Sequence, residues 1–126
     1  MIDKKYFFLA GLPRSGNTLL SSILNQNPEI NVSANSFVCD ILFHGISLQY
    51  HECFQNFPDK KSLEDFIAST FDSYYQNWKG NYIIDRGPWG TPQNLNILKE
   101  YLNNEIKIIV SDKLNNSTTF TSNFIY

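Results

Sequence analysis

The sequence predicts an α/β fold in which helices flank a parallel sheet. Short apolar runs that are typical of strands alternate with longer segments whose apolar residues recur at helical spacing. The connections lack the signals of tight hairpins, so successive strands are expected to run parallel and to be joined by helices. The chain has 126 residues, of which 42% are hydrophobic and 15% aromatic, and this is enough for one domain with a modest core.

The first elements are expected to be a strand over residues 6–10, a loop, and a helix over residues 17–26. The inner side of this helix is predicted to hold four apolar residues: Leu19, Leu20, Ile23 and Leu24. Pro28 ends the helix because proline cannot continue it, and residues 29–33 are predicted to form a short second strand.

Two further helices are predicted before the next strand. Ser36 is placed to cap a helix over about residues 37–50. Its inward residues are predicted to be Val38, Ile41, Leu42 and Ile46. Ser62 is expected to cap the second helix, with Asp65 completing the capping pattern and Gly80 ending the helix. The residues that recur at helical spacing in this second helix are Leu63, Phe66, Ile67, Thr70, Phe71, Tyr74, Tyr75 and Trp78.

The second half of the chain continues the alternation. Residues 82–85 are predicted to form a compact strand, residues 86–90 a turn-rich loop, and residues 106–110 another strand. Between the two strands, Pro92 stands at the first position of a further helix.

Residues 1–110 are therefore assigned to one domain, and residues 111–126 differ from it in composition. This last stretch is rich in Ser, Thr and Asn. Three interpretations fit this composition: a frayed tail, an edge strand, or the truncated continuation of the domain. We favour truncation, so the fold is expected to be incomplete at the C-terminus.

Charge and cysteine content exclude several classes of protein. The net charge of −2 argues against a nucleic-acid-binding protein and against a basic membrane-surface protein. The first apolar run is too short for a signal peptide or a membrane span. Cys39 and Cys53 fit no disulfide framework and no zinc spacing, so a reducing compartment, the cytoplasm, is expected.

The strongest functional motif is Gly-Leu-Pro-Arg-Ser-Gly-Asn-Thr, between the first strand and the first helix. Gly11 and Gly16 keep the spacing of a P-loop, and Thr18 stands at its Ser/Thr position. Such a loop wraps backbone N–H groups around a phosphate at a helix N-terminus. The usual Lys is replaced by Asn17, and the nearby cation is Arg14. The loop predicts a P-loop-type fold of three layers. The missing Lys argues against an ordinary nucleotide hydrolase, because in those enzymes this Lys contacts the terminal phosphates beside Mg²⁺.

This loop and its helix resemble those of sulfotransferases that use 3′-phosphoadenosine 5′-phosphosulfate (PAPS). Gly-Leu-Pro-Arg-Ser-Gly-Asn-Thr-Leu-Leu, followed by Ile-Leu-Asn-Gln-Asn-Pro, is similar to the 5′-phosphosulfate loop of the Pro-Arg-Ser-Gly-(Thr/Ser)-Thr-Leu branch. The resemblance is specific over about residues 6–30 and weaker, though collinear, to about residue 110. It implies PAPS as the sulfuryl donor, no metal, and an acceptor hydroxyl or amine that is unknown.

The resemblance also implies roles for individual residues. Arg14 would contact the 5′-phosphate and stabilise the charge that develops on the bridging oxygen; the alternative is a surface-loop arginine. The other donor-binding residues of the loop would be Gly11, Pro13, Ser15, Gly16, Asn17 and Thr18, with a helix cap that holds no ligand as the alternative.

Asp85 and Arg86 resemble an Asp-Lys/Arg pair that many members of the family carry near the donor–acceptor cleft. Arg86 is one of only two arginines, and both follow a strand-like run, where α/β folds place ligand sites. Asp85 would then orient Arg86 or accept a proton, although a structural ion pair explains the pair equally well. Trp89 either lines the cleft or covers the core.

The general base that must accept the acceptor's proton is not evident. In the tyrosylprotein branch a Glu follows the second strand, whereas this chain has Asn35 there, so tyrosine sulfation is not supported. The possible substitutes are Asp40, His44, His51 and Asp85. Our catalytic candidates are Arg14, Asp85 and His44, and a structural role is the alternative for a lone helical His. His51-Glu52-Cys53 has no second ligand cluster, so no metal site is predicted.

The family's motif for the 3′-phosphate, an Arg followed by a Ser, should come after the strand that ends at Val110. This chain has Lys113 instead of an Arg, with serines and threonines behind it. Two alternatives to an active sulfotransferase therefore stay open. They are a non-catalytic or truncated remnant of the family, and a kinase-like P-loop phosphotransferase that uses ATP and Mg²⁺.

Overall fold

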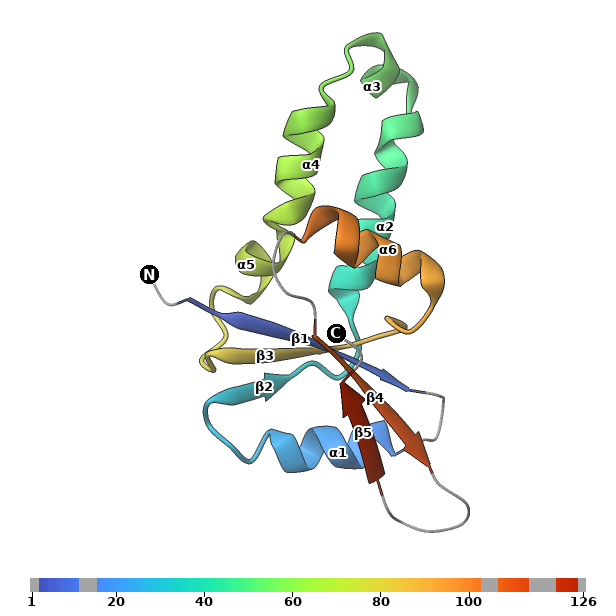
Figure 1. The fold of residues 1–126 in the computed structure, drawn as a ribbon. Coiled ribbons are helices and arrows are strands. Elements are labelled where there is room, and N and C mark those ends of the chain that lie inside the picture. The colour runs from blue at the N-terminus through green and yellow to red at the C-terminus, as the bar shows by residue number, and fades with distance from the viewer. Residues whose placement is uncertain (1–2, 12–15, 103–106, 114–119, 125–126) are drawn as a thin grey trace.

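The computed structural model describes residues 3–11, 16–102, 107–113 and 120–124 (Figure 1). It is an α/β fold built on a five-stranded sheet with the order β2-β3-β1-β4-β5. The strands are β1 (Lys5–Gly11), β2 (Ile30–Val32), β3 (Tyr82–Arg86), β4 (Lys107–Lys113) and β5 (Phe120–Phe124). The first four strands of this order run parallel, and β5 pairs with β4 antiparallel.

Helices lie on both sides of the sheet (Figure 1). They are α1 (Asn17–Leu24), α2 (Phe37–Ser47), α3 (Glu52–Asn56), α4 (Lys60–Ala68), α5 (Thr70–Tyr75) and α6 (Pro92–Tyr101), with a 3-10 turn η1 (Leu48–Tyr50). One side is covered by α1, and the other by α2, α5 and α6. The pair formed by α2 and α4 extends well beyond the sheet, with α3 at its far end.

The central strand β1 contributes to the core on both sides of the sheet. Successive side chains of a strand point to opposite faces, so Phe8 and Ala10 pack with α2, α5 and α6 while Leu9 packs with α1. Phe8 and Leu9 are almost completely buried. A strand that is buried on both faces is typical of a parallel sheet, which explains why this run is apolar throughout.

The alternation predicted from the sequence is confirmed for the parallel strands and most helices. Ser36 caps α2, because its hydroxyl accepts a hydrogen bond from the Cys39 amide at 3.0 Å. Pro92 is the first residue of α6, as predicted, and Thr91 caps that helix. Two details of the helices are corrected: α2 gives way to η1 at Leu48, and the short helix α3 was not predicted.

The prediction of one long helix from Ser62 is wrong in two respects: the helix starts earlier, and it is divided into α4 and α5. Asp59 caps α4, and it accepts hydrogen bonds from both the amide and the hydroxyl of Ser62. Ser62 is therefore a partner of the cap, and a carboxylate three residues upstream outcompetes it. The helix breaks at Ser69, whose hydroxyl donates to the Phe66 carbonyl, and α5 ends before Gly80.

The predicted inner face of α1 is half correct. Leu20 and Leu24 pack against the core, whereas Leu19 and Ile23 are 54% and 50% exposed. The four apolar residues form a broad apolar face on this helix. Only the part of that face that contains Leu20 and Leu24 packs against the sheet.

The predicted parallel sheet is confirmed for four strands, and β5 adds an antiparallel strand at its edge. Of the three alternatives for residues 111–126, the edge strand is the one that the structure shows over Phe120–Phe124. Only residues 114–119 separate β4 from β5, and a parallel connection needs a crossover of about a dozen residues or more. An antiparallel pair is therefore the geometry that this short connection allows, and the truncation of the domain stays a prediction.

Gly80 offers a stability test at the amino end of the sheet. A Cβ at this position would lie 2.8 Å from the Glu29 carbonyl oxygen and 2.7 Å from Asn31 Oδ1. Gly80→Ala is expected to lower the free energy of unfolding by about 2 kcal/mol, because backbone must move to admit the methyl group. Urea unfolding followed by circular dichroism measures the change.

The matched control is Gly45→Ala in α2, where the new Cβ would lie at an ordinary 3.7 Å from Ile67 Cγ1. This variant is expected to gain about 0.5–1 kcal/mol from its better helix propensity. Equal effects of the two substitutions would contradict the close approach at Gly80.

Candidate functional site

The candidate site lies where the carboxyl ends of β1 and β3 meet. β1 leads through α1 to β2, on the far side of β3, whereas β3 leads through α6 to β4, on the far side of β1. The helices α1 and α6 lie on opposite sides of the sheet (Figure 1). The two connections therefore part between β1 and β3, and open α/β sheets bind ligands in the crevice at such a switch point.

Gly16 leads from the loop into α1. Its backbone is left-handed, with φ 87° and ψ 16°, a conformation that favours glycine. The N-cap residue Gly16 has no side chain with which to cap this helix, and the first turn has no acidic residue, so the helix N-terminus has a positive character that attracts anions. Gly11 is the last residue of β1, Asn17 is the first residue of α1, and Thr18 is exposed. Pro13, Arg14 and Ser15 lie outside the described residues.

Arg86 ends β3 beside the last residues of β1. It is in register with Leu9, and the next amide, that of Gly87, donates to the Leu9 carbonyl at 3.1 Å. The Arg86 amide donates to Ser33 Oγ at 2.9 Å. The Arg86 side chain is half-buried, and none of the described residues pairs with its guanidinium. A permanently charged residue therefore lies at the carboxyl edge, next to the strand that leads into the loop.

Asp85 lies one residue earlier and is completely buried on the side of α2 and α5. Its carboxylate accepts hydrogen bonds from Tyr75 Oη, from Trp89 Nε1 at 2.9 Å, and from the Ser36 hydroxyl. Burial raises the pKa of Asp85, and these three hydrogen bonds oppose that rise. Within the described residues, no ion pair joins Asp85 to Arg86. Asp85 is a buried carboxylate, and Arg86 is a cationic residue at the edge of the sheet.

The buried acid connects several elements beneath the site. Tyr75, whose pKa is raised by burial and by the charge of Asp85, also receives a hydrogen bond from the Ser33 hydroxyl. The same Ser33 oxygen holds the Arg86 amide, so one chain of hydrogen bonds runs from Arg86 through Ser33 and Tyr75 to Asp85. The arrangement fixes the ends of β2 and β3 against α5 and the cap of α2.

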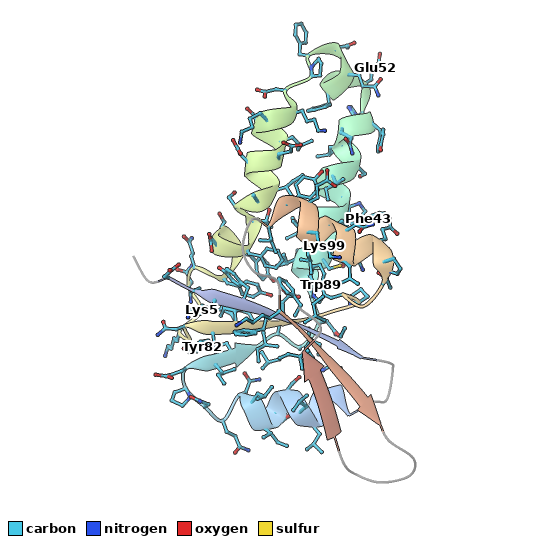
Figure 2. The ribbon with its side chains drawn as sticks, in the orientation of Figure 1. Lys5, Phe43, Glu52, Tyr82, Trp89 and Lys99 are labelled. Atoms are coloured by element: carbon cyan, nitrogen blue, oxygen red, sulfur yellow. The ribbon has the colours of Figure 1, made fainter. Side chains whose placement is uncertain are left out.

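Trp89 belongs to the core. Its side chain is fully buried, and Figure 2 shows it between the sheet and the helices above it. Its ring packs edge-on against Phe8, with centroids 5.1 Å apart, and also contacts Phe71. Of the two roles considered for Trp89, covering the core is the one that the structure shows.

The structure does not bring His44 to this edge. His44 is exposed in the last turn of α2, against the ring of Phe43. The helix starts at the carboxyl edge with its cap Ser36, and eight residues of helix correspond to about 12 Å along its axis. His51 is farther still, where it caps α3. Asp40 and Asn35 are nearer the edge and exposed, so Asp40 is the closest of the proposed substitute bases along α2.

Three residues of this region were not singled out from the sequence: Ser33, Ser36 as a partner of Asp85, and Tyr75. The predicted position of Ser33 at the end of the second strand was a signal for it. Tyr75 offered none, because its apolar spacing on the helix matched that of any core residue.

The chain matches no model of a known protein family and no curated protein. Among the helices that the structure describes, none combines the length and hydropathy that a bilayer-crossing segment requires. Within the same residues, His, Cys, Asp and Glu side chains are nowhere gathered in threes as a metal ion would need.

Proposed function

We propose that this chain is a sulfotransferase-like protein of the P-loop type that binds the 5′-phosphosulfate of PAPS between β1 and α1. Sulfuryl would pass to an acceptor hydroxyl or amine: the acceptor oxygen or nitrogen forms a bond to sulfur while the bond from sulfur to the bridging oxygen breaks. Adenosine 3′,5′-bisphosphate (PAP) leaves, and the acceptor's proton goes to a base or to water.

The observation that carries the proposal is the left-handed Gly16, which directly precedes α1 at the switch point of the sheet. Backbone amides that follow such a glycine point together and favour an anion. Arg86 adds a cation at the same edge. A guanidinium offers paired N–H donors that suit phosphate and sulfate oxygens. The motif residues Pro13, Arg14, Ser15, Asn17 and Thr18 complete the proposed donor site.

The buried acid has a supporting role in this proposal. A carboxylate with no solvent contact and three hydrogen-bond donors is poorly placed to take a proton from an acceptor. We therefore assign Asp85 the task of positioning the end of β3, including Arg86. The two free cysteines, one buried and one exposed, fit the reducing cytoplasm that we propose as its location.

Calorimetry with PAP tests donor recognition without knowledge of the acceptor. The chain is expected to bind PAP without metal, and at least about tenfold more tightly than it binds ATP with Mg²⁺, because position 17 lacks the Lys that serves a triphosphate. Tighter binding of ATP with Mg²⁺ would favour the kinase-like phosphotransferase instead.

A non-catalytic or truncated remnant is the second candidate, and the absence of an arginine after β4 favours it. Such a remnant would bind PAP weakly through the 5′-phosphate alone. Comparison of PAP with adenosine 5′-phosphate separates the two cases: equal affinities mean that the 3′-phosphate is not recognised, and a complete donor site is then excluded.

A further inference from the structure

A concavity lies at the amino-terminal end of β1, at the opposite end of the strand from the proposed donor site. It has a volume of about 700 Å³ and is lined by the start of β1, by α5 and by the segment that follows α5. β1 runs from Lys5 at this end to Gly11 at the carboxyl edge, a distance of about 20 Å for a strand of this length. The cavity is therefore separate from the site described above.

The lining of this cavity carries an excess of negative charge. Among the described residues that line it, the charged side chains are the carboxylates of Asp3 and Asp72 and the ammonium group of Lys4. The Lys4 ammonium donates to the backbone carbonyls of Trp78 and Gly80, so it is occupied by main-chain acceptors and pairs with neither carboxylate. Neither Asp3 nor Asp72 forms an ion pair with any described residue.

The Tyr6 hydroxyl lies in the negative electrostatic potential of the two carboxylates. Its hydroxyl donates to Asp72 Oδ1 at 2.6 Å, which leaves Oδ2 without a partner among the described residues. Burial raises the pKa of Tyr6, and the hydrogen bond to Asp72 and the charges of Asp72 and Asp3 raise it further. Both carboxylates thus act on the same point of the cavity wall, where they disfavour a second negative charge and favour a positive one.

The rest of the lining consists of two aromatic side chains, Tyr6 and Trp78, and of the polar residues Ser69, Ser73 and Gln76. They are held in place by other rings: Tyr6 contacts Phe71 and Tyr75, and Trp78 packs edge-on against Tyr75 with centroids 4.7 Å apart. The π faces of Trp and Tyr attract cations and also cover apolar groups. A ligand with a positive charge next to a small apolar portion matches both features of this wall.

We propose that this cavity binds an organic cation, with a primary ammonium or guanidinium group that donates to Asp3 and Asp72 and an apolar portion that contacts Tyr6 and Trp78. Oδ2 of Asp72 is an open acceptor for such a donor. The hydrogen bond from Tyr6 holds the Asp72 side chain in one orientation, which reduces the ordering that binding requires. The site is independent of the donor site at the carboxyl edge.

Calorimetric titration with 2-phenylethylammonium, compared with the neutral 2-phenylethanol, tests the proposal on the whole chain. Saturable binding of the amine is expected, with the alcohol at least about tenfold weaker because it lacks the charge. Asp72→Asn and Asp3→Asn are each expected to weaken amine binding about threefold to fivefold, as for partly exposed ion pairs. PAP affinity should stay unchanged in both variants, which separates this site from the donor site.

The control is Glu52→Gln, which removes one negative charge at the far end of the helical pair (Figure 2). It is expected to leave amine binding unchanged. If Glu52→Gln weakens binding as much as Asp72→Asn does, the attraction is general and the cavity is not a site. Equal binding of the alcohol, or no saturable binding of the amine, would overturn the proposal as well.

Discussion

Replacing Asp85 by alanine is expected to lower the free energy of unfolding by about 3 kcal/mol. The substitution leaves three buried donors, on Ser36, Tyr75 and Trp89, without their acceptor. Each unsatisfied buried donor costs about 1–3 kcal/mol of stability. The variant no longer bears the desolvation cost of a buried carboxylate, but this gain offsets only part of the loss. Urea unfolding monitored by circular dichroism gives the value directly.

Two controls define what Asp85 contributes. Asp40→Ala removes an exposed aspartate from α2 and should change stability by no more than about 0.5 kcal/mol. Asp85→Asn keeps the size and one acceptor oxygen, so its loss should fall between the two alanine variants, at about 1–2 kcal/mol. A loss of under about 1 kcal/mol for Asp85→Ala would show that the buried hydrogen bonds do not hold these elements together.

Arg14→Ala is expected to weaken PAP binding by at least about 100-fold while leaving the circular dichroism spectrum unchanged. In the proposed site this guanidinium contacts the 5′-phosphate, and the loss of one member of a close charge pair costs about 2–5 kcal/mol of binding free energy. A hundredfold change in affinity corresponds to about 2.8 kcal/mol. Calorimetry at fixed ionic strength provides the measurement.

The control for Arg14 is Lys60→Ala, which removes the same charge from the exposed surface of α4. Its PAP affinity should equal that of the parent chain. If Arg14→Ala also binds PAP as the parent does, Arg14 is not part of the donor site. Equal losses in both variants would mean that only net charge matters.

The elements with strong local signals could be predicted from the sequence. The apolar run of β1, the serine that caps α2 and the proline that opens α6 each determine structure through neighbours a few residues away. The motif between Gly11 and Thr18 lies between β1 and α1, as predicted, while its role as a donor site stays a prediction.

The features that were missed depend on competition or on distant partners. Asp59 and Ser62 are both good helix caps, and only the structure shows that Asp59 is the cap. The burial of Asp85 depends on Tyr75 and on the cap of α2, which the chain brings together only after folding. The edge strand β5 was one of three alternatives for residues 111–126 and not the favoured one, because it depends on its pairing with β4.

The register of the sheet also bears on how this chain can fold. Lys5 pairs with Tyr82, and Phe7 pairs with Lys107, so the central strand finds both of its neighbours far along the chain. During synthesis the aromatic and aliphatic stretch of β1 leaves the ribosome long before either neighbour exists, and contacts so remote in sequence form slowly. The nascent polypeptide must therefore carry this hydrophobic strand unpaired for a time, and a chaperone has the greatest opportunity to act during that period.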